Sequence, residues 1–511
     1  MERYNFIKRS ITTGKAAIAI LALLSIILVL LASLTTALNA QTAERIGIGA
    51  FRLSNGNTIP DLPAFQRVTL IARPTPESNI RIEVWLPEEN WNGRFLGTGN
   101  GGGGGNINYL NLIAGLKRGF AVANTDLGTS PDAHSVATYP ERWKDFGYRA
   151  THEMTVAAKK IIEKYYHRSP EYSYFVGCST GGQQALMEAQ RFPEDYDGII
   201  AGAPANNRTH LHISFLWNYV QTNKEPGRLF QSEQLSKLTA ALLETNVGKD
   251  GGAPGDNFLT NPLAATSDCD CWDKILTKQQ QEALKKIYTG PVNPITGENV
   301  YTSFPVGSEN EESGLRMHQD FAGVRSLLYP FEWTFGTDYD FLSFDFNKDI
   351  EKMDAVLAPI LNANNPDLEI FRERGGKLLM YTGTSDALVP FQDAVDYYER
   401  VIAAQGSVEK AQSFFRYFLV PGMSHCGGGP GVNDFGQHLS PNILQDEEHD
   451  ILTALIHWVE KAKAPTKIIA SAYIDGNPDK GVRMRRPLFP YPEFPHYKGG
   501  DPSLPENYKP E

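Results

Sequence analysis

Cysteine is scarce in this chain of 511 residues, which contains four. Small disulfide-stapled scaffolds are therefore excluded, because they need many more crosslinks for their length. Long runs of lysine and arginine are also missing, and 48 basic against 59 acidic side chains give a formal net charge of −11. Nucleic-acid binding requires clustered positive charge, so no nucleic-acid partner is expected. The hydrophobic content of 41% and the charged content of 21% are ordinary globular values, which excludes wholesale disorder.

Long hydrophobic runs are limited to one, at residues 16–34. Four basic residues precede it: Arg3, Lys8, Arg9 and Lys15. A positive start, an apolar core and a small-residue exit predict a secretory signal at residues 1–40, cleaved near Ala40. The run is also close to the lower limit for a membrane span, so an uncleaved anchor is the alternative. The body of the protein is expected to be secreted or periplasmic, or held outside the cytoplasm by that anchor.

The rest of the chain shows a broken rhythm of short apolar strands and amphipathic helices. Strands are predicted near residues 79–84, 94–96, 120–123, 172–176 and 199–200, with helices at 153–166 and 182–191. Such alternation predicts a mainly parallel sheet covered on both faces. The rhythm stops after Ala205 and returns with strands at 377–381 and 413–420 and a helix at 446–462. We predict an α/β core in two parts, residues 41–205 and 373–511, with an inserted lid domain at 206–372.

A serine motif follows the strand at 172–176. Residues 177–181 read Gly-Cys-Ser-Thr-Gly, which matches G-x-S-x-G, and a helix follows. A nucleophile on such a strand-to-helix turn needs small neighbours, so that its hydroxyl stands clear of the sheet. Ser179 is therefore the predicted nucleophile, and the amide of Thr180 would face a developing oxyanion. A glycine/serine turn without chemistry is the alternative.

A base and an orienting acid are expected on later strand-end loops, in the order serine, aspartate, histidine. Asp386 comes just after the strand at 377–381, and His425 lies in a glycine-rich loop after the strand at 413–420. The other histidines lack this setting. Among them, His210 and His212 form an H-x-H pair without a nearby cysteine or acidic partner. We predict that this pair lies on the surface rather than in a metal site.

Two cysteines flank the predicted catalytic residues. Cys178 precedes Ser179, and Cys426 follows His425. If the serine and the histidine share a hydrogen bond, their neighbours should lie within the Cα separation of about 4.4–6.8 Å that a disulfide requires. We therefore expect a Cys178–Cys426 disulfide in the exported protein, with two buried thiols as the alternative. Cys269 and Cys271 are expected to be free thiols or a local bridge rather than a metal site.

Three segments then make the chain recognisable: GCSTGGQQALMEAQRFPEDYDGIIAGAPA, YTGTSDALVP and GMSHCGGGPG. They closely resemble the tannase and feruloyl esterase family, and so do SNIRIEVWLPEENWNGRFLGTGNGG, RGFAVANTDLGT and RRPLFPYP. The resemblance implies an α/β-hydrolase fold with a large inserted lid domain. It also implies a small-molecule substrate, an ester of an aromatic acid of the galloyl, feruloyl or terephthaloyl type. By this match Ser179 is the nucleophile, Asp386 the orienting acid and His425 the base, and the two flanking cysteines are bridged.

The resemblance also raises the question of a metal. The family lid often carries a calcium loop of closely spaced Asp-Gly pairs, and the matching stretch here is KDGGAPGDNFLTNP. It keeps Asp250 and Asp256 but is longer and less acidic. A structural calcium ion at these two residues is therefore one expectation, and a solvated loop is the other. No cofactor is expected to be required for catalysis.

A glycine-rich loop after the strand at 94–96 admits two interpretations. Residues 97–102 fit G-x-G-x-x-G, and Asp126 follows at a distance typical of dinucleotide-binding units. However, more glycines follow instead of a good helix start, and exported proteins rarely meet NAD. We favour the alternative, in which an amide of Gly101 or Gly102 completes the oxyanion hole with Thr180.

The aromatic-rich segment at residues 329–346 is predicted to be lid core, with an aromatic wall for an aryl substrate as the alternative. Together these observations predict an exported serine carboxylic ester hydrolase that works through an acyl-enzyme. Two other functions stay open: a non-catalytic ligand-binding protein with the same fold, and an amide hydrolase that uses the same triad. The oligomeric state is left open.

Overall fold

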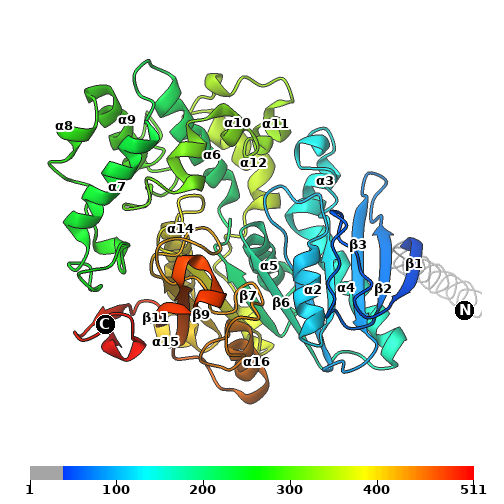
Figure 1. Ribbon diagram of the computed structural model, residues 1–511. Coiled ribbons are helices and arrows are strands. Elements are labelled where there is room, and N and C mark those ends of the chain that lie inside the picture. The colour runs from blue at the N-terminus through cyan, green and yellow to red at the C-terminus, as the bar shows by residue number, and fades with distance from the viewer. Residues whose placement is uncertain (1–37) are drawn as a thin grey trace, which may run out of the picture.

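A nine-stranded sheet is the centre of the computed structural model, which describes residues 38–511 (Figure 1). Its strands are β1 (Leu38–Ile46), β2 (Phe65–Ala72), β3 (Ile80–Pro87), β4 (Arg94–Thr98), β5 (Ala121–Thr125), β6 (Tyr172–Cys178), β7 (Gly198–Gly202), β8 (Lys377–Gly383) and β9 (Phe415–Val420). The spatial order is β1-β2-β3-β5-β4-β6-β7-β8-β9. The pairs β1-β2, β2-β3 and β3-β5 are antiparallel. The pairs β5-β4, β4-β6, β6-β7, β7-β8 and β8-β9 are parallel. The predicted α/β fold is confirmed.

The two parts of the sheet differ in sequence pattern because they differ in burial. β5 and β7 are buried at every position, as expected for central parallel strands covered on both faces. β2 instead alternates between buried and half-buried residues, as an antiparallel strand near an edge does. Such a strand has a weak apolar signal, and the sequence analysis did not anticipate β1 or β2.

Helices cover both faces of the sheet and make two hydrophobic clusters. On one face lie α2 (Tyr109–Lys117) and α16 (Ile451–Lys461), whose buried leucines and isoleucines pack with β5, β6 and β8. On the other face lie α4 (Ala150–Tyr166), α5 (Thr180–Arg191) and α14 (Phe391–Gln405). A small sheet of β10 (Ile468–Tyr473) and β11 (Val482–Leu488) contacts β9. The C-terminal pair β12 (Pro495–Tyr497) and β13 (Tyr508–Pro510) follows it in the chain.

The segment between β7 and β8 is helical and lies above the parallel part of the sheet (Figure 1). It contains α6 (Arg208–Asn223), α7 (Ser232–Asn246), α8 (Trp272–Ile275), α9 (Lys278–Thr289), α10 (Phe321–Arg325), α11 (Tyr329–Phe335), α12 (Asp349–Leu361) and α13 (Glu369–Glu373). Of the predicted domain boundaries, residue 205 lies between β7 and α6, and residue 372 lies within α13. We call this helical segment the lid.

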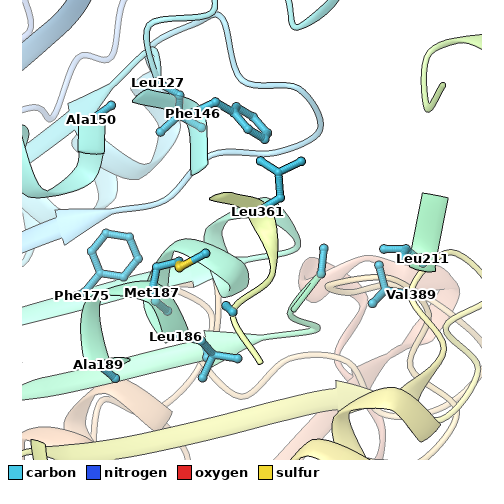
Figure 2. Close-up of a cluster of buried hydrophobic side chains, with 14 of the residues drawn as sticks. Leu127, Phe146, Ala150, Phe175, Leu186, Met187, Ala189, Leu211, Leu361 and Val389 are labelled. Atoms are coloured by element: carbon cyan, nitrogen blue, oxygen red, sulfur yellow. The ribbon is translucent and has the colours of Figure 1, made fainter. Parts of the chain in front are cut away.

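The lid shares a hydrophobic core with the sheet layer. Figure 2 shows Leu211 of α6 and Leu361 of α12 in one buried cluster with Phe146 and Leu186 of the core. The aromatic segment at residues 329–346 contributes to the same cluster, since the indole of Trp333 stacks on Trp143 with ring centroids 5.5 Å apart. The segment that was predicted to be lid core therefore also packs against the sheet layer.

The predicted export signal at residues 1–40 lies almost entirely outside the described residues. Within residues 38–511, none of the helices has the length and apolar character needed to span a bilayer.

Candidate active site

Ser179 stands on a sharp turn between β6 and α5, as the G-x-S-x-G pattern predicts. Its backbone has φ 65° and ψ −118°, in the left-handed region that a residue with a side chain rarely adopts. The turn closes only because its neighbours lack side chains: a Cβ on Gly177 would lie 2.4 Å from the carbonyl oxygen of Gly181. The strained backbone turns the serine side chain away from the sheet and into a cavity.

Asp386 and His425 meet at the carboxyl ends of β8 and β9. The His425 Nδ1 lies 2.8 Å from Oδ2 of Asp386, whose side chain is fully buried. The other carboxylate oxygen, Oδ1, accepts hydrogen bonds from the amides of Leu388 at 3.0 Å and Val389 at 2.8 Å. A carboxylate held by two amides accepts a hydrogen from Nδ1, which leaves the imidazole Nε2 as an acceptor.

Both Ser179 and His425 line a cavity of about 360 Å³ between the sheet and the lid. The Ser179 hydroxyl makes no hydrogen bond with any residue in the described part of the chain. Catalytic hydrogen bonds are often long in a ligand-free enzyme and tighten when substrate binds. The structure thus brings Ser179 and His425 to one cavity and Asp386 into contact with the imidazole, although more than 200 positions separate the serine from the other two.

A disulfide joins the serine turn to the histidine loop. Cys178 and Cys426 are bonded, with their Cα atoms 6.0 Å apart and 248 positions between them. Because each cysteine is the chain neighbour of a catalytic candidate, the bond fixes the distance between the two loops. Cys269 and Cys271 pair with each other in the lid.

Free backbone amides face the same cavity. Gly101, Gly102 and Thr180 line it, and none of their N–H groups has an acceptor within residues 38–511. Thr180 is buried, where amides are almost always paired, and Gly101 and Gly102 are exposed, so all three N–H groups are available to a molecule bound in the cavity. The Thr180 hydroxyl donates to the Gly102 carbonyl at 2.5 Å, which holds the glycine loop against the serine turn.

Arg208, at the start of α6, is a cavity residue that the sequence analysis missed. Its side chain is buried, and its Nη2 lies 3.1 Å from the Gly102 carbonyl and 2.9 Å from Oγ1 of Thr180. Its Nε donates to the hydroxyl of Tyr329 in the lid at 2.8 Å, and its Nη1 donates to Oε1 of Gln183 at 3.3 Å. One guanidinium therefore ties the glycine loop, the serine turn and the lid together. A lone arginine in a helix carries no sequence pattern that reveals this role.

The predicted surface position of His210 and His212 is wrong. His212 is 3% exposed and lines the cavity, and its Nδ1 donates to the carbonyl of Leu327. Burial, and to a smaller extent the nearby Arg208 guanidinium, lower the pKa of His212 to about 3. His210 lies 2.7 Å from the Asp354 carboxylate. His212 is buried and His210 is half-buried because α6 lies between the sheet layer and the other lid helices, which the local sequence does not show.

The residues proposed for calcium do not fit that ion. Asp250 Oδ1 accepts from the amides of Gly248 and Gly252, and its Oδ2 accepts from those of Thr260 and Asn261. The Asp256 carboxylate accepts a hydrogen bond from the amide of Ala253. It also lies 2.8 Å from Nη2 of Arg486, whose side chain is 2% exposed. The carboxylate oxygens that calcium would need are thus held by N–H donors, and a guanidinium from β11 supplies the positive charge.

The dinucleotide interpretation of the glycine loop also lacks support in the structure. Asp126, which would have to bind a ribose, is fully buried and lies 2.7 Å from Nε of Arg81. Its other oxygen accepts from the amides of Arg81 and Gly128. No lone pair is left facing a ligand, and the glycine loop turns into the wall of the serine cavity instead.

Comparison with known proteins assigns the chain to a family. The model for the family described as tannase and feruloyl esterase matches residues 67–510. An uncharacterized esterase of Xanthomonas campestris pv. campestris is 35% identical, over 88% of this chain and 85% of its own length. The mono(2-hydroxyethyl) terephthalate hydrolase of Piscinibacter sakaiensis is 32% identical, over 84% and 81%. The crystal structure of feruloyl esterase B from Aspergillus oryzae superimposes with a TM-score of 0.82 at 25% identity and covers 93% of this chain and 97% of that one.

The fold and these likenesses define a carboxylic ester hydrolase built on an α/β-hydrolase sheet. The chain belongs to the tannase and feruloyl esterase family.

The disulfide gives a first testable prediction. Replacing Cys178 and Cys426 together by serine should lower the free energy of unfolding by about 2–5 kcal/mol, because the unfolded chain regains the entropy of a very long loop. It should also lower kcat, since the histidine loop is no longer fixed to the serine turn. Thermal unfolding and ester turnover measure the two effects. The Cys269→Ser/Cys271→Ser variant is the control, and equal effects in both double variants would contradict the prediction.

A second prediction concerns calcium. Because protein donors already hold the Asp250 and Asp256 carboxylates, chelation with EDTA should leave the unfolding temperature and the esterase activity unchanged. Arg486→Met should lower the free energy of unfolding by about 3–5 kcal/mol, since it leaves a buried carboxylate without its partner. Arg485→Met, which changes the exposed neighbour, is the control. Loss of stability in EDTA, restored by calcium, would show that the ion is bound after all.

Proposed function

We propose that this protein is an exported serine esterase that hydrolyses esters of aromatic acids through a Ser179–His425–Asp386 triad. One observation carries the proposal: a strained serine, an aspartate-held imidazole and three unpaired amides line the same cavity. The substrate class rests on the relatives, because a feruloyl ester and mono(2-hydroxyethyl) terephthalate are both esters of aromatic acids. Export rests on the N-terminal pattern of charges and apolar residues.

The geometry suggests how the acyl group is transferred to the serine. His425 Nε2 accepts the proton of the Ser179 hydroxyl as the oxygen attacks the ester carbonyl, and the carbonyl oxygen becomes negative. The amide of Thr180 and those of the Gly101–Gly102 turn donate to that oxygen, and they are already in place before the reaction. The Asp386 carboxylate stabilises the imidazolium and keeps Nδ1 protonated.

The remaining steps follow from the same arrangement. The imidazolium gives its proton to the departing alkoxide, which leaves as the alcohol and completes an acyl-enzyme on Ser179. A water molecule then attacks the acyl carbon while His425 takes its proton, and the acid is released as Ser179 regains its hydrogen. No step needs a cofactor or a metal ion.

The serine assignment can be tested directly. Ser179→Ala should lower kcat for an activated aryl ester by about 10⁴-fold or more, because the covalent route is lost. It should also abolish labelling by a fluorophosphonate probe, while the circular dichroism spectrum stays unchanged. Ser173→Ala, which alters a buried serine on the same strand, is the control. Retained turnover and labelling in Ser179→Ala would refute the triad.

The same assay separates the other functions. Absence of both turnover and labelling in the wild-type protein would favour a non-catalytic binding protein. Faster hydrolysis of an aryl anilide than of the matched ester would favour an amide hydrolase.

Arg208 gives a prediction about positioning. Arg208→Met should lower kcat by about 10–100-fold with little change in KM, since the oxyanion donors act mainly in the transition state. The affinity for an arylboronic acid, which forms a tetrahedral anion on the serine, should fall in parallel, and Arg208→Lys should restore part of both losses. Arg191→Met is the control, because Arg191 also joins core and lid but lies outside the cavity. A rise in KM by about 10–100-fold with unchanged kcat would show instead that Arg208 acts in substrate binding.

A further inference from the structure

Three side chains with metal-ligating atoms meet near the C-terminal end of α5. They are His152 of α4, Glu188 of α5, and Asp195 in the turn between α5 and β7. Each offers one ligand atom, and the three atoms lie within 4.8 Å of one another. None of the three residues lines the catalytic cavity. The cluster is therefore separate from the triad, and a role for it is independent of the esterase function proposed above.

Glu188 is the unusual member of this cluster. Its side chain is fully buried, and neither carboxylate oxygen has a hydrogen-bond partner within residues 38–511. A buried carboxylate without partners is costly, so such groups are normally paired or bind metal ions. Burial, and then the neighbouring Asp195 carboxylate, raise the pKa of Glu188 well above its ordinary range. The site therefore favours any positive group that can enter between the two carboxyl groups.

The protein provides no positive group for Glu188. The ammonium of Lys159 is close to the cluster, but it donates to the backbone carbonyl of Asp195 and forms no ion pair with Glu188 in the described part of the chain. The imidazole of His152 pairs with Asp195, since its Nδ1 lies 2.6 Å from Oδ2 of that residue. Glu188 thus faces one carboxylate that is already engaged and has no counter-charge of its own.

His152 is already oriented as a ligand. Its ring stacks on Phe192 with the centroids 4.0 Å apart, which fixes the direction of Nδ1 toward Asp195. With its hydrogen on Nε2, the neutral imidazole presents the Nδ1 lone pair to the two carboxyl groups. The His152 side chain is 28% exposed, whereas Glu188 and Asp195 are buried. An ion can therefore enter from the solvent on the side of the imidazole.

We propose that His152, Glu188 and Asp195 form a binding site for a divalent transition-metal ion of the Zn²⁺ type. One imidazole and two carboxylates are ligands that Zn²⁺ accepts, and a water molecule completes a four-coordinate site. Ligands bound to one zinc ion at about 2.0–2.2 Å lie roughly 3.5 Å apart, so shifts of about 1 Å bring the three atoms onto the ion. Two carboxylates and one divalent ion have no net charge, which removes the cost of the unpaired buried carboxylate.

The ion joins α4 to α5 and to the turn before β7. Because α5 begins directly after Ser179, an ion at its other end stabilises the helix that carries the serine turn without contacting the cavity. The site has three protein ligands and the ion must displace protons from them, so we expect an affinity of about 1–100 µM. Protein purified without added zinc is then already ion-free, and EDTA alone leaves its stability unchanged.

Isothermal titration calorimetry with Zn²⁺ on the EDTA-dialysed full-length protein tests the proposal. We expect one ion per chain at micromolar affinity, and a rise in the unfolding temperature of about 2–4 °C at a hundredfold excess over Kd. Millimolar Ca²⁺ or Mg²⁺ should not displace Zn²⁺, since both prefer sites built from oxygen ligands alone. A Kd above about 1 mM, or displacement by Ca²⁺ or Mg²⁺, would overturn the proposal.

Variants then assign the ion to the cluster. Glu188→Gln keeps the shape of the side chain but removes a charged ligand, so the affinity for Zn²⁺ should fall at least about tenfold and the rise in unfolding temperature should disappear. His152→Phe should have the same effect while it keeps the stack on Phe192. Glu194→Gln, which changes an exposed acid beside Asp195, is the control and should bind within about threefold of the wild type. Binding unchanged in Glu188→Gln would show an adventitious ion only and overturn the proposal.

A spectroscopic measurement decides the question even if these variants do not fold. Co²⁺ takes the place of Zn²⁺ in such sites, and its visible absorption is much stronger with four ligands than with six. The wild-type protein should give the strong four-coordinate spectrum with one equivalent of Co²⁺, and Zn²⁺ should abolish it. The weak six-coordinate spectrum, typical of an ion held loosely at the surface, would overturn the proposal.

Discussion

The bond between Cys178 and Cys426 is the constraint on which the site depends. A parallel sheet brings the carboxyl ends of its strands to one edge, but the loops beyond those ends are free to vary. Here the loop after β9 is tied covalently to the turn after β6, directly beside Ser179 and His425, which exchange a proton in the proposed mechanism. Both Ser179 and Cys426 have positive φ, and the crosslink helps to hold this otherwise unfavourable backbone. The strained serine is thus supported from outside the turn itself.

A second, non-covalent connection runs through Arg208. Its guanidinium contacts the glycine loop, the serine turn and the lid, so the proposed oxyanion donors and the lid are held by one side chain. Because the Arg208 side chain is buried, its charge is screened little by solvent and its hydrogen bonds are strong. The lid is therefore part of the catalytic framework, in keeping with the continuous hydrophobic cluster that joins it to the sheet.

Much of this organisation could be predicted from the sequence. The features that were missed depend on contacts between distant parts of the chain or on strands with a weak apolar pattern. The strands β6, β8 and β9 are buried over most of their length and have clear apolar runs, and their carboxyl ends are followed by Ser179, Asp386 and His425. β2 was not predicted because a half-buried antiparallel strand has a weak signal, and β1 was not predicted because it is exposed at residues 41–45. His212 was misplaced because its burial comes from lid helices packed over α6. The calcium expectation could not foresee Arg486, which lies 230 positions from the Asp256 carboxylate that it holds.

The buried ion pair of Asp256 and Arg486 joins a loop of the lid to β11 without a metal ion. The loop that holds Asp256 also contacts the strand-end loops that carry Asp386 and His425, since Thr384 donates to the carbonyl of Leu259 and Gly422 packs on Phe258. A dissolved ion in that place could leave whenever its concentration falls. A positive group carried by the polypeptide cannot diffuse away, so this corner of the enzyme is complete once the last strands have folded, whatever the mineral content of the medium around it.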